Sequence, residues 1–236
     1  MISIALTGCR TNSTNKQAET PETSQTDSAK ASPEAETPQT SLNSPLAQQD
    51  AHDVRPLLVC FGDSLTAGYG ADQGESYPDY LQADLDAQGF NYRVVNEGIS
   101  GNTTKDGILR LPTILALKPA VVVVEFGGND GLRGLPIAES RANLDQIVRT
   151  LKASGTKVVL AGITLPPNYG PDYIHQFDET YTLIAKKYNV PLLPFLLRGV
   201  FGTAGMMQAD QTHATAAGNK IVAGNVLPLI APLLRK

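Results

Sequence analysis

The chain has 236 residues, of which 42% are hydrophobic and 18% are charged, and its formal net charge is −4. This length suffices for one domain of ordinary size together with an appendage. No basic stripe that could bind a phosphate backbone occurs in the sequence, which argues against a nucleic-acid partner. The chain has two cysteines, Cys9 and Cys60, so a disulfide framework is not expected.

The first nine residues, MISIALTGC, end in Leu6-Thr7-Gly8-Cys9, which resembles a bacterial lipoprotein lipobox. In such a signal the cysteine becomes the lipidated first residue after cleavage. The apolar stretch before the box has about six residues, fewer than the roughly 7–15 of a complete signal, and no Lys or Arg precedes it. We interpret residues 1–9 as a truncated lipoprotein signal that would attach the chain to a membrane through Cys9. The alternative is an N-terminal segment with a chance cysteine.

Residues 10–55 are rich in Ser, Thr, Gln, Glu, Ala and Pro, and they contain no Phe, Trp or Tyr. Such a segment cannot bury enough apolar surface to offset the entropy lost on ordering it, so it is predicted to be a disordered polar linker. A linker directly behind a lipobox suits a tether that holds a folded domain away from a membrane. The remaining residues, 56–236, are enough for a single hydrophobic core.

Short apolar runs divide this domain and predict its strands. They lie at residues 57–61, 92–95, 121–124, 157–161 and 191–193. Their hydrophobicity is continuous rather than alternating, which indicates burial on both faces, as in a parallel sheet. Cys60 lies in the first run and is expected to be a buried strand residue.

Helical patterns lie between and after these runs, at residues 77–88, 137–154, 173–189 and 214–234. Ser76 is the expected N-cap of the first, Gly89 and Gly155 are expected to end the first and second, and Pro228 is expected to break the last. The alternation of strands and helices predicts an α/β fold, a three-layer α/β/α doubly wound (flavodoxin-like) sheet of about five parallel strands. Ligands bind such sheets at the carboxyl ends of the strands.

A candidate nucleophile follows the first strand in the sequence Gly62-Asp63-Ser64-Leu65. A serine at this point lies where the ligand crevice of the sheet is expected. The alternative is a helix-capping or turn serine, which is the commoner role in a strand-to-helix loop. The motif is not the G-x-S-x-G nucleophile elbow, because Thr66 replaces the second glycine.

A nucleophilic serine needs a general base, and the chain has only three histidines. His52 lies in the predicted linker, whereas His175 and His213 each follow an aspartate by three residues, Asp172 and Asp210. Such a unit can place a carboxylate against one ring nitrogen and leave the other for a hydroxyl. The spacing fits both histidines and does not choose between them. Either one could equally be a surface loop histidine.

Two glycine-rich segments after strands could supply donors to a developing oxyanion. Gly98-Ile99-Ser100-Gly101-Asn102 follows the second strand, and Gly127-Gly128-Asn129-Asp130 follows the third. Glycine allows a ligand to approach the backbone closely, and an asparagine amide is a neutral donor. The alternative for each segment is a turn that requires a positive φ angle.

Four blocks, in order VCFGDSLTAGYG, NEGISGNTT, FGGNDGLRGLP and DQTHATAAG, together resemble the GDSL/SGNH hydrolase family. The resemblance covers essentially residues 56–236. It is closest to the branch of bacterial periplasmic arylesterases, acyl-CoA thioesterases and lysophospholipases, which implies a location in the bacterial periplasm or cell envelope. The chain departs from the pattern in the last block, where Ala214 stands in place of the usual proline after the histidine.

The resemblance also implies roles for individual residues. Ser64 would be the nucleophile and His213 its base, oriented by Asp210. The N–H groups of Ser64 and Gly101 and the side-chain amide of Asn129 would form the oxyanion hole. No metal or organic cofactor is expected, because the histidines are too few and too scattered for a zinc site and no phosphate-binding loop occurs.

The expected substrate is a small acyl ester or thioester, including lysophospholipids. Residues 163–177 are predicted to form a lid or wall over the crevice, and apolar side chains on this segment and after the third strand would contact the acyl group. These are Leu132, Leu135, Tyr169, Tyr173, Ile174 and Phe177. The alternative is that they pack the loop. Competing functions are a carbohydrate O-acetyl esterase of the same fold, a non-catalytic cell-envelope binding module, and a flavodoxin-like nucleotide-binding protein, which would lack its phosphate loop.

Overall fold

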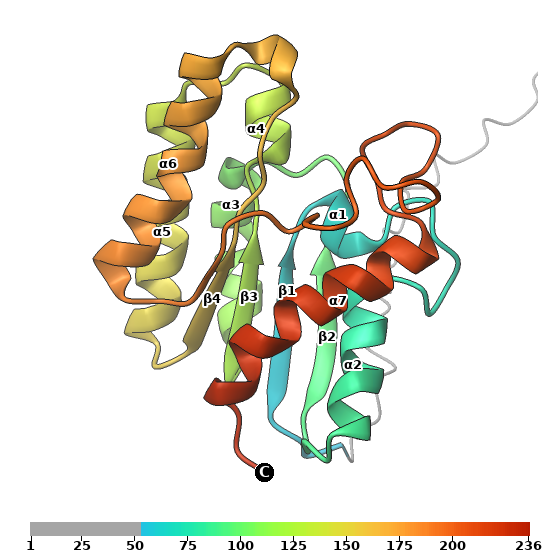
Figure 1. The fold of residues 1–236 in the computed structure, drawn as a ribbon. Coiled ribbons are helices and arrows are strands. Elements are labelled where there is room, and N and C mark those ends of the chain that lie inside the picture. The colour runs from blue at the N-terminus through green and yellow to red at the C-terminus, as the bar shows by residue number, and fades with distance from the viewer. Residues whose placement is uncertain (1–52) are drawn as a thin grey trace, which may run out of the picture. The chain divides into compact units, whose positions relative to one another are not determined.

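The structure, a computed structural model, describes residues 53–236. The predictions for residues 1–9 and 10–52, including the lipid on Cys9, lie outside these residues. The described part forms one body in which a parallel sheet is covered by helices on both faces (Figure 1). No helix within it is both long enough and apolar enough to cross a membrane.

The sheet has five strands in the order β2-β1-β3-β4-β5, and every neighbouring pair is parallel. The strands are β1 (Leu57–Gly62), β2 (Arg93–Gly98), β3 (Val121–Glu125), β4 (Lys157–Ala161) and β5 (Leu192–Leu193). All five overlap the apolar runs in the sequence, although β2 extends beyond its run to Gly98. The side chains of β3 are fully buried, and Cys60 of β1 is buried as expected, since helices cover both faces.

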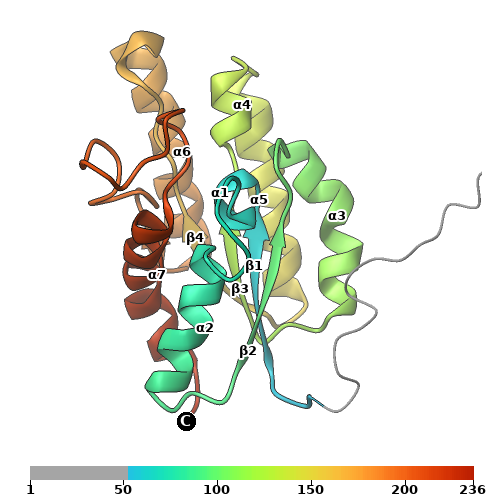
Figure 2. The same cartoon turned by 90° about the vertical axis from the view of Figure 1, so that its right-hand side faces the viewer.

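The helices form the two outer layers, as the alternation in the sequence predicted. On one face α2 packs against α7, and on the other α5 packs between α3 and α6. Figure 2 shows α2 and α7 on the opposite side of the sheet from α3 and α5. The bounds are α1 (Ser64–Ala67), α2 (Tyr77–Ala87), α3 (Thr104–Ala116), α4 (Gly128–Leu132), α5 (Ile137–Ala153), α6 (Pro171–Tyr188) and α7 (Ala216–Ile230), with short 3-10 turns at Pro167–Tyr169 and Ala231–Leu233.

Local sequence explains several helix ends. Ser76 caps α2 with a reciprocal pair of hydrogen bonds to Asp79, and Gly89 follows the helix at a φ of 77°. The prediction that Pro228 breaks the last helix was wrong, because α7 continues through it to Ile230. A proline so near the C-terminus removes one N–H and forfeits only one hydrogen bond of an otherwise well-packed helix.

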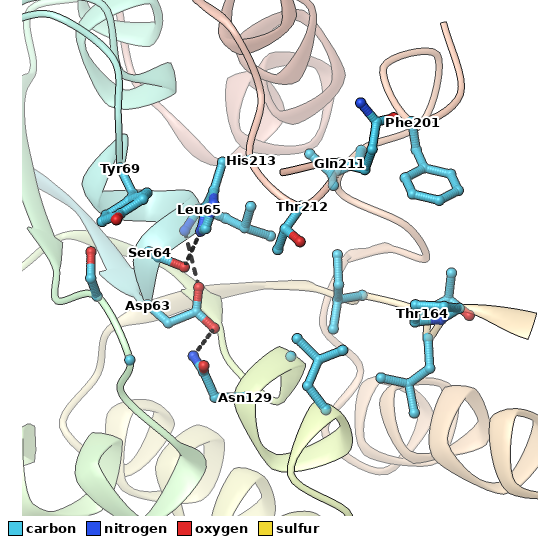
Figure 3. Close-up of a pocket in the computed structure, with 18 of the residues that line it drawn as sticks. Asp63, Ser64, Leu65, Tyr69, Asn129, Thr164, Phe201, Gln211, Thr212 and His213 are labelled. Carbon is cyan, nitrogen blue, oxygen red and sulfur yellow. Dashed lines mark hydrogen bonds between the residues drawn. The ribbon is translucent and has the colours of Figure 1, made fainter. Parts of the chain in front are cut away.

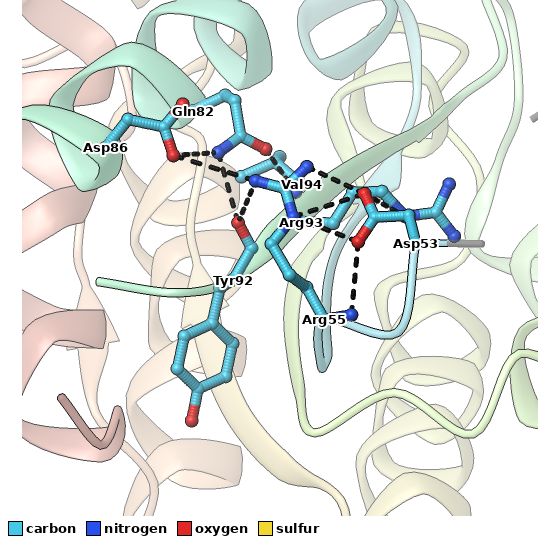
Figure 4. A network of polar contacts seen from close by, with 7 residues as sticks. All are labelled: Asp53, Arg55, Gln82, Asp86, Tyr92, Arg93 and Val94. Atoms are coloured by element: carbon cyan, nitrogen blue, oxygen red, sulfur yellow. Dashed lines mark hydrogen bonds and ion pairs between the residues drawn. The ribbon is translucent and has the colours of Figure 1, made fainter. Parts of the chain in front are cut away.

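A polar network fixes the start of the described chain at the edge of the sheet where the strands begin (Figure 4). Asp53 accepts a hydrogen bond of 2.7 Å from Arg55 and lies 3.8 Å from the Arg93 guanidinium. Arg55 also donates to the carbonyl of Tyr92, to which Gln82 donates as well. The hydrogen bonds from Arg55 lower the pKa of Asp53 to about 2. Asp53 and Arg55, assigned to the linker from the sequence, therefore contact the domain.

Candidate active site

Ser64 is the first residue of α1, directly after the carboxyl end of β1. Asp63 caps this short helix, because its Oδ1 accepts the N–H of Leu65 at 3.0 Å. The turn requires Gly62, since a Cβ there would lie 2.2 Å from Thr66 Oγ1 and 2.6 Å from the Glu125 carbonyl oxygen. This close approach of backbones presents the Ser64 hydroxyl at the expected edge of the sheet.

Ser64 lies against His213, which comes from the loop before α7 (Figure 3). The distance from His213 Nε2 to Ser64 Oγ is 2.9 Å, and that from His213 Nδ1 to Asp210 Oδ2 is 2.6 Å. The structure thus brings together all three residues of the hydroxyl–imidazole–carboxylate set predicted from the sequence. His175 is exposed on α6, whereas His213 is the histidine that contacts Ser64.

Asp210 is held as an anion by its own loop. Burial acts to raise its pKa, but hydrogen bonds from the His213 ring and from the N–H groups of Thr212 and His213 together lower it to about 2. An ionised carboxylate at Nδ1 keeps the proton on that nitrogen and leaves Nε2 free to accept the proton of Ser64.

The ring of Tyr69 packs against the imidazole of His213, a contact that the sequence analysis did not identify. Its ring centroid is 4.6 Å from that of His213, and the two planes are tilted by 43° (Figure 3). The Tyr69 carbonyl accepts a hydrogen bond of 2.7 Å from Gln208, which lies in the same loop as His213. The tyrosine therefore restricts the directions in which the imidazole can turn.

The three predicted oxyanion donors all line one pocket next to the Ser64 hydroxyl. Gly101 has a φ of 82°, a conformation that favours glycine. Within residues 53–236 the N–H groups of Ser64 and Gly101 donate to no protein acceptor. Asn129 differs, because its amide donates to Asp63 Oδ2 at 3.1 Å and to the Asn102 carbonyl at 2.9 Å.

Arg110 of α3 holds the loop that carries Gly101. Its guanidinium donates to Asn102 Oδ1 at 2.9 Å and to the Glu97 carbonyl at 2.6 Å, and it forms an ion pair of 3.3 Å with the Glu97 carboxylate. It also lies over the Phe61 ring, 4.9 Å from the centroid. A single side chain thus ties β1, β2 and the loop of Gly101 together, another role that the sequence analysis missed.

The pocket beside Ser64 has a volume of about 350 Å³ and a mostly apolar lining. Leu132 lines it as predicted, together with residues after β4 and after β5 that Figure 3 shows on the side away from Asp63. The apolar side chains are Leu65, Leu132, Ile163, Leu165, Pro166, Phe195, Leu197 and Phe201. Of these, only Leu132 was selected from the sequence, and residues 163–166 belong to the segment predicted to cover the crevice. The last three were missed because the segment after β5 is irregular and shows no periodicity that would mark a pocket wall.

The other predicted substrate contacts lie outside the pocket lining. The hydroxyl groups of Tyr169 and Tyr173 donate to the carbonyls of Leu132 and Leu135. Phe177 is buried against Tyr181 at a centroid distance of 5.7 Å, and Ile174 packs partly buried against the core. In the structure these four side chains pack their segment against the rest of the domain and do not line the pocket. A direct contact between them and a substrate stays a prediction.

Comparison with known proteins shows to which family the chain belongs. The profile of the GDSL-like Lipase/Acylhydrolase family matches residues 60–221. The chain belongs to this family. The GDSL-like chain is 47% identical over 190 residues to esterase TesA of Pseudomonas aeruginosa, covering 80% of this chain and 93% of that protein. It is 37% identical over 178 residues to the thioesterase 1/protease 1/lysophospholipase L1 of Escherichia coli, covering 75% and 84%.

Solved structures agree with this assignment. The chain matches the crystal structure of TesA with a TM-score of 0.73 and 46% identity, over 75% of this chain and 99% of the other. It matches the psychrotrophic esterase EstA from Pseudoalteromonas, inhibited by monoethylphosphonate, with a TM-score of 0.71 and 32% identity, over 75% and 97%. The GDSL-like chain is therefore an enzyme of the ester hydrolase type, with the α/β/α fold of these neighbours.

Proposed function

We propose that the chain is a serine ester hydrolase in which Ser64 attacks the acyl carbon and His213 is the general base. The observation that carries this proposal is the continuous hydrogen-bonded line from Ser64 Oγ through both ring nitrogens of His213 to Asp210, with distances of 2.9 and 2.6 Å. These distances lie within the range in which a base accepts a proton directly from a nucleophile.

The reaction has two stages. In the first, the Ser64 proton moves to His213 Nε2 as Oγ forms a bond to the acyl carbon and the carbonyl π electrons move onto oxygen. When the tetrahedral species collapses, the bond to the leaving alcohol or thiol breaks, and that group receives the proton from His213. In the second stage, water loses a proton to His213, attacks the acyl-enzyme and releases the acid and the Ser64 hydroxyl.

The negative oxygen that forms in each stage would receive hydrogen bonds from the N–H groups of Ser64 and Gly101 and from Asn129. The two N–H groups are already without protein acceptors in the described chain. The Asn129 amide must share one of its two existing bonds, to Asp63 or to Asn102, with the oxyanion. Fixed donors of this kind stabilise a transition state because they need little reorganisation as charge develops.

The substrate class that fits the pocket is an acyl ester or thioester with an apolar acyl group. The wall of Leu132, Ile163, Phe195 and Phe201 offers contact to methylene groups, and its lining provides few polar partners for a sugar ring. Relatives include an esterase, a thioesterase/lysophospholipase and an arylesterase of Vibrio mimicus that is 40% identical over 164 residues, covering 69% of this chain and 82% of that protein. These names support ester, thioester and lysophospholipid substrates over sugar acetates.

A panel of aryl esters, acyl thioesters, lysophospholipids and acetylated sugars tests the proposal. Wild type is expected to hydrolyse medium-chain acyl substrates, while Ser64→Ala and His213→Ala lose turnover by several orders of magnitude. An organophosphonate probe should add one phosphonyl group to Ser64 in wild type and none in Ser64→Ala. Turnover of acetylated sugars alone would favour the O-acetyl esterase alternative, and an unlabelled, inactive wild type would favour a binding module.

The location is a separate proposal. We propose that the enzyme works in the cell envelope, attached through a lipid on Cys9, because a lipobox-like segment precedes a polar linker. A 34% identity over 116 residues to the uncharacterized lipoprotein YqeF of Bacillus subtilis is compatible with this. Mass spectrometry of the mature N-terminus decides, since an unmodified Cys9 would exclude the anchor.

A further inference from the structure

A second carboxyl group lies beneath the nucleophile, in a place that the proposed reaction does not use. Glu125, the last residue of β3, has no exposed surface, and Asp63 is only 2% exposed. The Asp63 N–H donates to Glu125 Oε2 at 3.3 Å, which places the two acidic residues next to each other. Within residues 53–236 neither one forms an ion pair with a lysine or arginine.

The environment of Glu125 is that of a neutral acid. Its Oε2 accepts the Thr66 hydroxyl at 2.8 Å and the Asp63 N–H at 3.3 Å. Its Oε1 is buried, and no N–H or O–H donor from the described chain reaches it. An ionised glutamate would leave this oxygen without any partner for its charge, which is a costly arrangement in a protein interior.

The titratable groups around the pair do not supply a compensating positive charge. Thr66 continues the network to the Tyr77 hydroxyl at 3.3 Å, and Cys60 and Tyr181 lie near it on the core side. Tyr77, Cys60 and Tyr181 are all neutral, because burial raises the pKa of each of them. On the pocket side, His213 favours an ionised Asp63 when the imidazole carries a second proton. Burial therefore keeps one proton on the pair, and the more deeply buried Glu125 is its natural position.

We infer that Glu125 is a positioning residue, a protonated acid that donates to Asp63 and thereby sets how the Asn129 amide meets the oxyanion. This inference rests on the proposed function. Asp63 Oδ2 accepts one of the two N–H groups of Asn129, so the charge on Asp63 determines how tightly that amide is held. A donated proton draws negative charge from Asp63 toward Glu125 and weakens its hold on Asn129.

The same proton also reduces the electrostatic repulsion between Asp63 and the negative oxygen that forms during attack. A fully ionised Asp63 beside Ser64 would repel the negative oxygen that forms during attack, and low solvent exposure would strengthen that repulsion. Sharing the Glu125 proton lets Asp63 keep its cap on Leu65 and its bond to Asn129 at a smaller electrostatic cost. A buried acid that stays neutral so that it can donate a hydrogen bond is a known device in active sites.

Two substitutions separate positioning from packing. Glu125→Gln keeps the shape, the donor to Asp63 and the acceptor for Thr66, so kcat should stay near that of wild type. Glu125→Leu keeps much of the volume but has no donor, and a misplaced oxyanion donor should lower kcat by about 10²-fold with little change in KM. A purely structural role would instead leave the kinetics of both folded variants equal. Equal kinetics, or a Glu125→Gln as impaired as Glu125→Leu, would overturn the inference.

Infrared spectroscopy tests the proton directly and does not depend on activity or on the folding of Glu125→Leu. At pH 7.5, wild type labelled with ¹³C-glutamate should show a protonated carboxyl C=O stretch that shifts with the label and disappears in Glu125→Gln. A missing band would show that Glu125 is ionised and would overturn the inference. If wild type hydrolysed no ester but kept the band, the proposed function would fail while the buried proton stood.

Discussion

The side-chain amide of Asn129 donates a hydrogen bond of 3.1 Å to the carboxylate of Asp63, the residue next to the nucleophile. This bond joins the segment after β3 to the segment after β1. It orients the amide toward Ser64 before any substrate binds. The same bond competes with the oxyanion for the amide, so the strength of the Asp63–Asn129 pair is expected to affect turnover.

Asn129→Ala removes one of the three proposed oxyanion donors. The loss of such a donor lowers kcat by about 10²–10³ and changes KM little, because the interaction forms only in the transition state. Steady-state kinetics on a medium-chain aryl ester measure both constants. Asn129→Asp is the matched variant, since it keeps the shape and replaces the donor by an acceptor; it should be at least as impaired. A defect confined to KM would contradict the oxyanion role.

Arg110→Met should impair both stability and turnover. The substitution leaves the mostly buried Glu97 carboxylate unpaired and releases Asn102, at a cost of about 3 kcal/mol in the free energy of unfolding. Urea denaturation measures this cost, and kcat should fall because the Gly101 loop loses its tie to β1 and β2. Arg133→Met is the control: Arg133 is exposed and, among the described residues, its side chain hydrogen-bonds to the Gly101 carbonyl alone, so its loss should cost far less stability.

Phe201→Ala should weaken the preference of the enzyme for esters with longer acyl groups. Phe201 lines the pocket, and each methylene buried against such a wall contributes about 0.8 kcal/mol. The ratio of kcat/KM for an octanoyl ester over that for an acetyl ester should therefore fall by about tenfold for each two methylenes that lose their contact. Tyr173→Phe, outside the pocket lining, serves as the control and should leave the ratio unchanged. An unchanged ratio in Phe201→Ala would show that the acyl group does not contact Phe201.

The raised pKa of Asp63 predicts how the stability of the protein depends on pH. Burial raises its pKa to about 6, whereas an unfolded aspartate titrates near ~4. Between these values the folded protein binds more protons than the unfolded chain, so the free energy of unfolding falls as pH rises through this window. Wild type should therefore lose on the order of 2 kcal/mol relative to Asp63→Asn between pH 4 and pH 7. Parallel urea denaturation curves for the two proteins measure this, and a constant difference would refute the raised pKa.

Much of the fold follows from the sequence because short, continuous runs of β-branched residues such as 121–124 favour strands that are buried on both faces. The edge of the sheet where Ser64 lies also follows, since parallel strands all end at one edge. The pairing of Ser64 with His213 rather than His175 depends on where two distant loops meet, and the resemblance to a family, not spacing, selected it. The geometry now agrees with that choice.

The missed residues share a physical reason. Glu125 ends a valine-rich strand and carries no local pattern that marks a buried acid, because its partner Asp63 is 62 residues away. Phe195, Leu197 and Phe201 lie in an irregular segment whose inward direction is set by the packing of β5 and α7. Tyr169 and Tyr173 are not among the residues that line the pocket; their hydroxyl groups donate to the carbonyls of Leu132 and Leu135, and a contact between either ring and a substrate stays a prediction.

The network of Asp53, Arg55 and Arg93 lies where the strands begin, whereas Ser64 lies where they end (Figure 1). Lys236 also lies at the starting edge, over the ring of Phe90 in the turn that leads to β2. A solid support coupled at either Asp53 or Lys236 would therefore face away from the mouth of the pocket. Immobilised in this way, the enzyme would keep its entrance open to bulky substrates, and a fluorescent tag placed at the same positions would not report on substrate entry.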